Sequence, residues 1–250
     1  MVEATPPRAA LVVVPTFNEA ATIGEVIERL QAADPSLHVL VVDDGSPDGT
    51  ADLVERIGAD RPGVFVLRRR AKEGLGQAYL AGFRWGLEHG YGAMVEMDAD
   101  LSHDPGAAPG LVAALSGADL VIGSRYVPGG SIPSWSPHRR AISTLGNRYS
   151  SWMLGLPVRD LTSGFRAYRG ELLGRLPLDE VRAGGYGFQI EMAYRTARAG
   201  GRIVEVPIRF VDRVEGESKM SMRITLEALV LVTAWGVRRR VGRRGVPARR

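Results

Sequence analysis

The chain has 250 residues, of which 45% are hydrophobic and 24% are charged, the composition of an ordinary globular protein with a large core. It contains no cysteine, which excludes disulfides, thiolate catalysis and cysteine-bound zinc. The formal net charge is +4, yet seven arginines lie in the segment 238–250, and subtracting them leaves −3 for residues 1–237. This local basicity favours an anionic partner such as a lipid headgroup surface.

Short runs of branched aliphatic residues alternate with helical patterns through the first half of the chain. Strands are expected at 11–14, 39–42, 64–67, 93–97 and 120–122. Helices are expected between them, at 22–32, 49–58, 75–89 and 105–115. Such an order is typical of βαβ units, so we predict one α/β domain with a mostly parallel central sheet flanked by helices.

The alternation ends after residue 123 in a polar segment with Gly and Pro that reaches His138, where we predict a mobile loop over a site. Helices are expected at 139–154 and 188–199, and an extended segment at 203–211. The apolar stretch 224–237 would reach only about 20 Å as a helix, short of the roughly 30 Å hydrocarbon layer. We therefore do not expect it to span a bilayer.

The segment Asp98-Ala99-Asp100 closes the apolar run 93–97. Residues i and i+2 of an extended chain point the same way, so both carboxylates can converge on Mg²⁺ or Mn²⁺ and leave positions for phosphate oxygens. An acidic loop that caps the next helix is the alternative. A second acid cluster, 43–50, follows the run 39–42, and two acid-tipped strands in one sheet indicate a site at its carboxyl edge.

Several common nucleotide and hydrolase motifs are absent. The turn Pro15-Thr16-Phe17-Asn18-Glu19 lacks the glycines of a dinucleotide-binding turn, and the chain has no Walker A and no G-x-S-x-G sequence. Its four histidines show no helical pairing, which disfavours a zinc site. These absences disfavour a Rossmann dehydrogenase, a P-loop enzyme and an α/β-hydrolase.

Cationic side chains follow two of the expected extended segments and open one helix. They are Arg125, the pair Arg139 and Arg140, and Arg213 with Lys219. Each side chain could be a solvated surface charge. Guanidinium and ammonium groups also suit phosphate oxygens, which makes these positions candidates for binding a phosphorylated ligand.

Seven segments in order carry a family resemblance. They are PTFNE (15–19), VVDDGSPDGT (41–50), MDADLSHDP (97–105), GSRYVPGG (123–130), LTSGFRAYR (161–169), GYGFQIEM (185–192) and FVDRVEGESKMS (210–221). Together these segments resemble the polyprenol (dolichol) phosphate mannose synthases, which are family 2 glycosyltransferases with the GT-A fold. The likeness spans residues 11–221, and the segment 210–221 is far more specific than the acid pair.

The resemblance implies metal-dependent, inverting transfer of mannose from GDP-mannose to a polyprenyl phosphate, giving β-linked polyprenyl phosphomannose and GDP. It divides the chain into a GT-A catalytic domain at 1–221, a short apolar or amphipathic helix at 222–237 and an Arg-rich tail at 238–250. Many relatives carry carboxyl-terminal transmembrane helices, whereas this chain has one short apolar segment. We therefore expect a peripheral protein on the cytoplasmic side of a membrane, with an anionic membrane surface or an integral membrane protein as partner.

The resemblance also implies where the donor and the metal bind. The GDP-mannose contacts carried over by position are Pro15, Phe17, Glu19, Val42, Asp44, Asp98, Ala99, Asp100, Arg125, Arg213 and Lys219, the first five for guanosine and the last two for the diphosphate. The implied surroundings of a Mg²⁺ or Mn²⁺ ion are Asp98, Asp100 and Ser102.

The acceptor phosphate is implied to meet Arg125, Arg139 and Ser143. Arg139 is preferred over Arg140 because it lies four residues before Ser143. With Asp100, these three residues are the expected catalytic set.

Alternatives remain at this point. The segment Gln189-Ile190-Glu191-Met192 does not match the Q-x-x-R-W signature of processive family 2 enzymes, so polymer synthesis is not expected. A polyprenyl phosphate glucosyltransferase that uses UDP-glucose is the nearest rival. No aromatic platform accompanies the arginine tail, so nucleic acid is not an expected partner. The retained acidic and basic positions disfavour an inactive scaffold.

Overall fold

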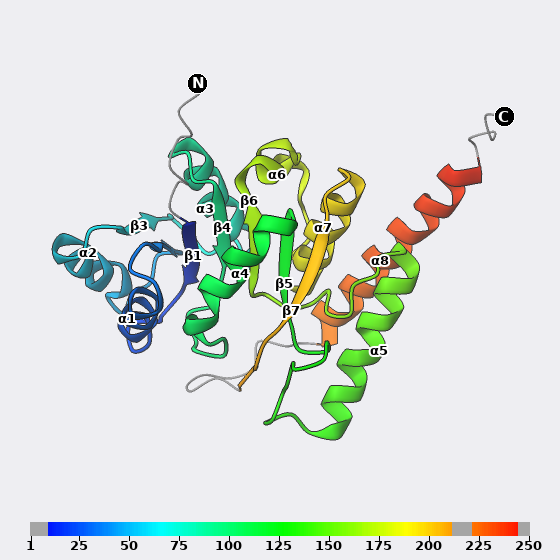
Figure 1. Cartoon of the computed structure of the whole chain (residues 1–250), viewed down its shortest axis with the longest axis horizontal. Coiled ribbons are helices and arrows are strands. Elements are labelled where there is room, and N and C mark those ends of the chain that lie inside the picture. Colours follow the sequence, from blue (N-terminus) through cyan, green and yellow to red (C-terminus); the bar gives the residue numbers. More distant parts are fainter. Residues whose placement is uncertain (1–9, 212–221, 245–250) are drawn as a thin grey trace.

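The computed structural model of the chain describes residues 10–211 and 222–244. A seven-stranded sheet of order β3-β2-β1-β4-β6-β5-β7 runs through its middle (Figure 1). The strands are β1 (Ala10–Thr16), β2 (His38–Asp43), β3 (Val64–Arg68), β4 (Ala93–Glu96), β5 (Leu120–Ser124), β6 (Arg166–Arg169) and β7 (Ile203–Pro207). Every neighbouring pair is parallel except that β6 runs antiparallel to both β4 and β5. The predicted α/β domain with a mostly parallel sheet is confirmed.

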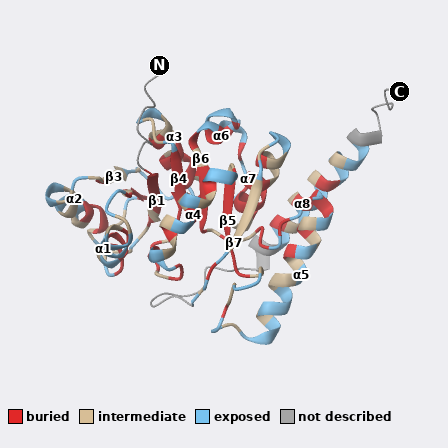
Figure 2. Ribbon diagram, in the orientation of Figure 1, coloured by how far each residue is buried: buried red, intermediate tan, exposed pale blue. Residues whose placement is uncertain are grey.

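Helices cover both faces of the sheet. They are α1 (Ile23–Ala33), α2 (Thr50–Asp60), α3 (Leu75–Glu88), α4 (Ala108–Ala114), α5 (Pro137–Leu154), α6 (Gly170–Arg175), α7 (Gly185–Arg198) and α8 (Met222–Arg244). Alternate residues of β1 enter two different core clusters, Leu11 and Val13 on one face and Val12 and Val14 on the other. The strands are accordingly buried along most of their length (Figure 2), which explains why the sequence shows continuous apolar runs there.

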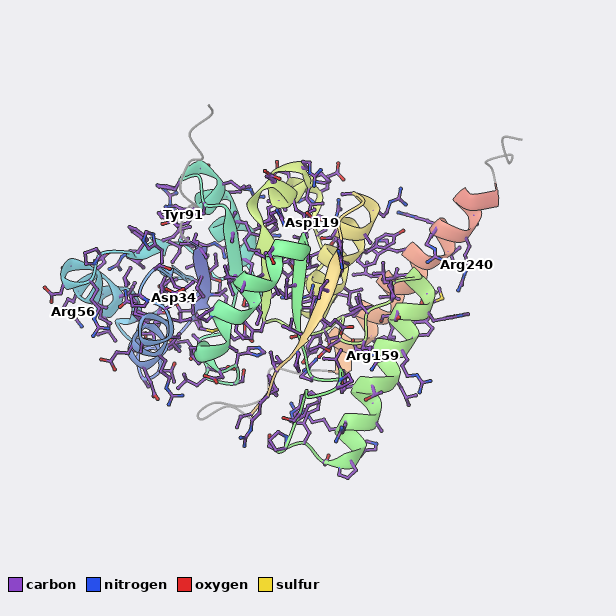
Figure 3. The ribbon with its side chains drawn as sticks, in the orientation of Figure 1. Asp34, Arg56, Tyr91, Asp119, Arg159 and Arg240 are labelled. Carbon is purple, nitrogen blue, oxygen red and sulfur yellow. The ribbon has the colours of Figure 1, made fainter. Side chains whose placement is uncertain are left out.

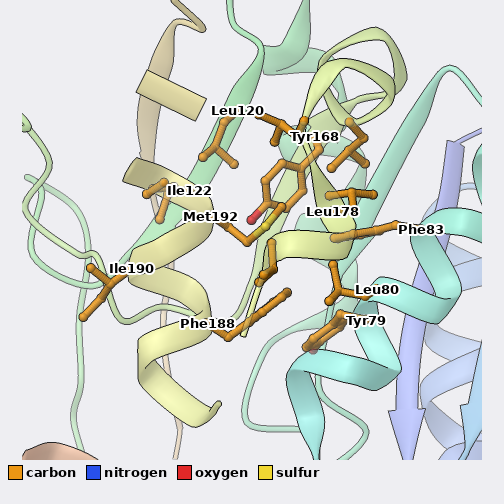
Figure 4. Close-up of a cluster of buried hydrophobic side chains, with 14 of the residues drawn as sticks. Tyr79, Leu80, Phe83, Leu120, Ile122, Tyr168, Leu178, Phe188, Ile190 and Met192 are labelled. Atoms are coloured by element: carbon orange, nitrogen blue, oxygen red, sulfur yellow. The ribbon is translucent and has the colours of Figure 1, made fainter. Parts of the chain in front are cut away.

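An aromatic layer joins α3 to α7 and β6 on one face of the sheet (Figure 4). The rings of Tyr79 and Phe188 are stacked with centroids 6.0 Å apart, and Phe83 meets Tyr168 edge-on at 5.3 Å. The helices approach closely because Gly76 faces Phe188: a Cβ atom there would lie 2.8 Å from the Phe188 ring. This packing fixes Tyr79 just below the carboxyl edge of the sheet.

The structure adds two elements that were not predicted and corrects the ends of two others. The antiparallel strand β6 and helix α6 were not predicted, and the regular strand β7 ends at Pro207 although the extended segment was expected to reach 211. The last helix does not end at 237 but continues through Arg244, because arginine is a good helix former. In the described part of the chain, no helix combines the length and apolarity needed to cross a bilayer.

Candidate active site

The carboxyl ends of β1, β2, β4 and β5 meet at one edge of the sheet. The strands pair in parallel, with Thr16 of β1 opposite Asp43 of β2 and Val13 opposite Glu96 of β4. Since each strand is followed by one of the polar segments singled out in the sequence, these segments gather at one edge, as expected for a ligand site in a parallel sheet.

The turns after β1 and β2 are bonded to each other. Asp43 accepts hydrogen bonds from Thr16 Oγ1 at 2.9 Å and from the Gly45 and Ser46 N–H groups at 3.1 and 2.9 Å. Ser46 Oγ in turn accepts from the Asn18 N–H at 2.9 Å. Asp43 therefore shapes the turn, which leaves its neighbour Asp44 as the carboxylate presented at the edge.

Arg69, just after β3 (Val64–Arg68), holds Asp44 and was missed in the sequence. Its Nη1 donates to Asp44 Oδ1 at 2.7 Å, and its Nη2 donates to Glu73 at 2.5 Å. Burial raises the pKa of Asp44 above its ordinary value, and the Arg69 guanidinium opposes this rise. Three residues on, Lys72 Nζ lies 4.0 Å from the centre of the Phe17 ring. The segment 69–74 thus contacts two residues expected at the nucleoside.

Replacing Arg69 with alanine should make nucleotide binding more sensitive to acid. Without the guanidinium, the pKa of Asp44 should rise further, because burial and the nearby carboxylates Asp43 and Glu73 all favour its protonated form. Binding that needs the carboxylate is present above this pKa and lost as pH falls through it. GDP titrations across pH should therefore show the loss at higher pH in Arg69→Ala than in the wild type. Identical pH profiles would contradict the role of Arg69.

The acid pair follows β4 as predicted. Asp98 is partly exposed and accepts a hydrogen bond from Tyr79 Oη at 3.0 Å, whereas Asp100 is buried and accepts from the Ser102 N–H at 3.1 Å. Gly164 lies next to the pair, since a Cβ atom there would be in ordinary van der Waals contact with Asp98 Oδ2 at 3.8 Å. Residues 10–211 and 222–244 hold no group of three or more acidic or histidine side chains suited to a metal. Carboxylate oxygens suit a hard cation, but two carboxylates alone supply too few ligands, so such an ion would need further oxygen ligands, for example from a phosphate.

A buried polar network lies beneath the acid pair. Gln189 of α7 donates to Glu96 Oε2 at 2.8 Å, and burial raises the pKa of Glu96 to about 7. The fully buried Arg166 donates to the backbone oxygens of Leu161, Ser163 and Gln189, each at 2.7 Å. These bonds hold the 161–165 segment and α7 against β4. They give structural roles to Arg166 in the motif LTSGFRAYR and to Gln189 in the motif GYGFQIEM.

Arg125 follows β5 and is locked to Asp160. Its backbone N–H and Nε donate to Asp160 Oδ2 at 2.9 and 2.7 Å, and its Nη2 donates to Asp160 Oδ1 at 2.7 Å and to Thr162 Oγ1 at 2.8 Å. Burial pushes the pKa of Asp160 upward, but the Arg125 charge and hydrogen bonds outweigh it and hold this pKa below its ordinary value. The bonds use Nε and Nη2, so Nη1 is the guanidinium nitrogen left for a ligand.

Arg139 and Ser143 of α5 lie on the same cavity as Arg125. The Arg139 guanidinium carbon lies 4.1 Å from the centre of the Trp135 ring, and Ser143 Oγ accepts a hydrogen bond from Tyr126 at 2.7 Å. Arg140 is exposed and is not among the residues that line the cavity. Of the two arginines, Arg139 is therefore the one that lines the cavity, and its role toward the acceptor stays a prediction.

The cavity has a volume of about 320 Å³ and lies between α5, α7 and α8. Its lining includes the polar residues Arg125, Arg139 and Ser143 and the apolar residues Ile190 of α7 and Ala228 of α8. A ligand with an anionic head and an apolar body matches this distribution.

Comparison with known proteins identifies the chain. The family model of glycosyl transferase family 2 matches residues 11–176. The chain belongs to the family 2 glycosyltransferases. It is 54% identical over 227 residues to an undecaprenyl-phosphate mannosyltransferase of Micrococcus luteus, covering 91% of this chain and 93% of the relative. It is 48% identical over 244 residues to a polyprenol monophosphomannose synthase of Mycolicibacterium smegmatis, covering 96% and 92%. The resemblance to the polyprenol phosphate mannose synthases is confirmed.

Solved structures share the fold of this family 2 glycosyltransferase. Glucosyl-3-phosphoglycerate synthase from Mycobacterium tuberculosis, in complex with UDP, superposes with a TM-score of 0.64 at 22% identity over 92% of this chain and 80% of the other. A mannosyltransferase from Pyrobaculum calidifontis, in complex with GDP-Man and Mn²⁺, gives 0.62 at 22% identity over 94% and 65%. Both superpositions support the GT-A fold.

Two apolar residues of the expected donor set have buried side chains in this glycosyltransferase. Val42 is fully buried in the core, and Ala99 is 3% exposed. Any contact of these two residues with a nucleotide would therefore use the backbone. Pro15, Phe17 and Glu19 are partly exposed at the turn after β1, as a binding role requires.

The two expected diphosphate residues, Arg213 and Lys219, lie outside the described residues. The segment just before them lies against two loops. The Val211 N–H donates to Ser102 O at 3.1 Å, and the Phe210 N–H donates to Ser131 O at 3.0 Å. Phe210 also forms an isolated bridge with His103. The loop after residue 123 that was predicted to cover a site is thereby connected, through residues 208–211, to the acidic loop that follows β4.

Proposed function

We propose that this enzyme transfers mannose from GDP-mannose to a polyprenyl monophosphate, giving polyprenyl phosphate β-mannose and GDP. The observation that carries the proposal is a cavity lined by both arginines and apolar side chains, one of whose arginines, Arg125, directly follows β5. Such a cavity suits a lipid phosphate. The names of the relatives from Micrococcus luteus and Mycolicibacterium smegmatis support the same acceptor class and the same sugar.

The donor side uses the turns after β1 and β2 and the acid pair. Pro15, Phe17, Glu19 and Asp44, with the Val42 and Ala99 backbone, take the nucleoside and its phosphates. Asp98 and Asp100, with Ser102, would hold Mg²⁺ or Mn²⁺, and the ion would supply charge stabilisation for the departing diphosphate. The Mn²⁺ and GDP-Man complex of the Pyrobaculum calidifontis mannosyltransferase supports this assignment. Arg213 and Lys219 are proposed to meet the diphosphate.

The acceptor side needs no strong general base. A phosphate monoester is already an anion at neutral pH, so its oxygen can attack the anomeric carbon directly. Arg125 Nη1, Arg139 and Ser143 orient that phosphate opposite the leaving GDP, and displacement from the opposite face inverts the configuration. Catalysis then consists mainly of positioning and charge stabilisation.

Replacing Arg139 with alanine should raise the apparent KM for polyprenyl phosphate by roughly 10- to 100-fold, because a hydrogen bond to a charged group contributes about 1.5–3 kcal/mol. The KM for GDP-mannose should change much less. Arg140→Ala is the matched control, since Arg140 is exposed on the same helix turn and does not line the cavity. A larger effect on GDP-mannose than on the lipid would overturn this division of the arginines.

We also propose that the enzyme binds peripherally to an anionic membrane surface on the cytoplasmic side. An integral membrane protein is proposed as a further anchor. Helices α5 and α8 lie side by side (Figure 1), joined by the hydrogen bond between Tyr149 and Thr233 at 2.7 Å. Their exposed apolar side chains are Ile142, Leu145 and Trp152 on α5 and Leu226, Val230, Val237 and Val241 on α8. Arg240, labelled in Figure 3, lies 4.4 Å from the Trp152 ring, so cations flank these apolar residues.

The test is an assay with radiolabelled GDP-mannose and a short polyprenyl phosphate, with and without EDTA. Label should move to the lipid, and EDTA should stop the transfer. UDP-glucose in place of GDP-mannose should give little product. Faster transfer from UDP-glucose would replace the proposed donor, and transfer unaffected by EDTA would remove the metal from the proposal.

A further inference from the structure

Another cavity, called the basic cavity below, lies between α6, α7 and α8. Its volume is about 400 Å³, within the roughly 300–1,000 Å³ typical of ligand sites. The described residues that line it include one carboxylate, Glu191, and four arginines, Arg175, Arg195, Arg198 and Arg238. Four positive charges and one negative charge leave +3. None of these five residues belongs to the donor, metal or acceptor sites assigned above.

One of the four arginines is neutralised within the protein. Arg195 Nε donates to Glu191 Oε1 at 2.8 Å, and Arg195 Nη1 donates to Glu180 Oε2 at 3.3 Å. The Glu191 carboxylate also accepts the Arg182 and Ala183 N–H groups at 3.3 and 3.1 Å. Because its oxygens are already bonded, Glu191 is not available to neutralise a second arginine.

The other three arginines keep their charge for a ligand. In the part of the chain that the structure describes, the ion pairs in the basic cavity are those of Arg195 alone. Arg175 and Arg198 lie in the last turns of α6 and α7, where cations offset the helix dipole, but Arg238 lies in the interior of α8. Three like charges around one cavity repel one another, and an anion bound among them would remove that repulsion.

Two aromatic side chains also line the basic cavity. The rings of Tyr194 and Trp235 are stacked with centroids 6.0 Å apart, and both side chains are half-buried. Arg198 lies 5.9 Å from the centre of the Tyr194 ring. Tyr and Trp combine an apolar body with a polar tip, and they are enriched at the level of lipid headgroups.

The basic cavity adjoins an apolar stripe on α8. The exposed residues of this stripe are Leu226, Val230, Val237 and Val241. At about 100° per residue, the four lie within about 60° of one another around the helix. Arg238 follows Val237 directly and so lies between the stripe and Trp235. An amphiphile with its anionic group in the basic cavity can therefore place its chains along the stripe.

We infer that the basic cavity binds the phosphate headgroup of an anionic phospholipid, at a site separate from the donor and acceptor sites. The guanidinium groups of Arg175, Arg198 and Arg238 meet the phosphate oxygens, and the acyl chains follow the apolar stripe of α8. The inference rests on the proposed membrane position and assigns one headgroup site to it. A bound phospholipid holds α8 at the membrane surface.

The test measures binding of soluble dihexanoyl-phosphatidylglycerol to the full-length enzyme by isothermal titration calorimetry, below the critical micelle concentration of the lipid. The double variant Arg198→Gln/Arg238→Gln should weaken this binding by roughly 10-fold or more, because two cations that meet the phosphate are lost. Arg139→Ala should not change it, since Arg139 lines the acceptor cavity instead. Wild-type affinity in the double variant would overturn the inference.

A matched control removes the same charge elsewhere. Arg56 and Arg61 line a groove of about 410 Å³ between α1 and α2, at the other end of the molecule from α8 (Figure 1). Arg56→Gln/Arg61→Gln should bind the short lipid like the wild type. Both double variants should keep the wild-type thermal midpoint, because the four side chains are exposed or half-buried. Both should also transfer mannose to farnesyl phosphate at the wild-type rate in neutral detergent.

A soluble phosphate ester tests the source of the phosphate. Glycerol 3-phosphate carries a phosphate but no acyl chain, so it should bind the wild type far more weakly than dihexanoyl-phosphatidylglycerol does. Equal affinities would overturn the assignment to a phospholipid.

Vesicles separate the inference from the proposed membrane position. The wild type should bind phosphatidylcholine vesicles that contain phosphatidylglycerol better than pure phosphatidylcholine vesicles. Arg198→Gln/Arg238→Gln should lower the partition coefficient onto the anionic vesicles by roughly 30-fold, which corresponds to about 1 kcal/mol for each lost cation. A wild type without preference for anionic vesicles would overturn the membrane position and the inference together. A preference that the double variant keeps in full would overturn the inference alone.

Discussion

The Asp100→Ala enzyme is expected to lose roughly 10²- to 10⁴-fold in kcat, because it removes half of the carboxylate pair that would hold the cation. Asp100 is buried at the sheet edge and its Oδ1 accepts the Ser102 N–H, so the side chain is fixed in place. The loss should be measured as mannose transfer over a range of Mn²⁺ concentrations. Saturating metal should not restore the rate.

Two controls accompany Asp100→Ala. Asp100→Asn keeps an oxygen for the Ser102 N–H while removing the charge, so it should be nearly as inactive as Asp100→Ala if the charge matters. Asp104→Ala removes a nearby exposed carboxylate that accepts the Gly106 N–H at 3.0 Å. It should retain most of the activity. Full activity of Asp100→Ala at saturating metal would refute the metal assignment.

Replacing Asp160 with alanine should reduce the free energy of unfolding by about 3–5 kcal/mol, because Arg125 would remain buried without its counter-ion. Asp160 is fully buried and Arg125 is 5% exposed, so water cannot readily compensate. The apparent KM for polyprenyl phosphate should also increase, since Asp160 fixes the guanidinium that faces the acceptor. Urea titrations and initial rates measure the two effects separately.

Two comparisons make this prediction specific. Asp52→Ala breaks a pair between Arg68 and Asp52 whose side chains are 48% and 61% exposed, and should lower the free energy of unfolding far less than Asp160→Ala does. The double variant Arg125→Met with Asp160→Leu should regain much of the stability but not the activity. A stable, fully active Asp160→Ala enzyme would show that the pair does not position the acceptor phosphate.

The lowered pKa of Asp160 also predicts how the free energy of unfolding depends on pH. Its pKa in the folded protein is held below the ordinary value, so its contribution is present above the unfolded-state pKa and is lost as pH falls through the folded-state value. The wild type should therefore lose stability in acid more steeply than Asp160→Asn. Equal slopes of unfolding free energy against pH would contradict this linkage.

The positions that the sequence predicted correctly depend on local patterns. Buried parallel strands produce continuous apolar runs, and the polar residues after them must lie at one edge. This reasoning places Asp44, Asp98 and Arg125 at the carboxyl edge of the sheet, where the structure has them. Strand β6 was missed because its four residues, Arg166–Arg169, include two arginines and carry no apolar run. Arg166 is nevertheless fully buried, because three backbone oxygens accept its hydrogen bonds.

By itself the sequence determined the order of strands and helices, the acid pair at the end of β4 and the family, because each depends on residues adjacent in the chain. Only the tertiary structure decided the partners of the charged groups and the shape of the acceptor cavity. Arg69 meets Asp44 across 25 positions and Arg125 meets Asp160 across 35. Residues of α5, α7 and α8 line one cavity only after the chain has folded. Such contacts depend on how distant elements pack, and hydrophobic periodicity specifies which face is buried but not which side chain it meets.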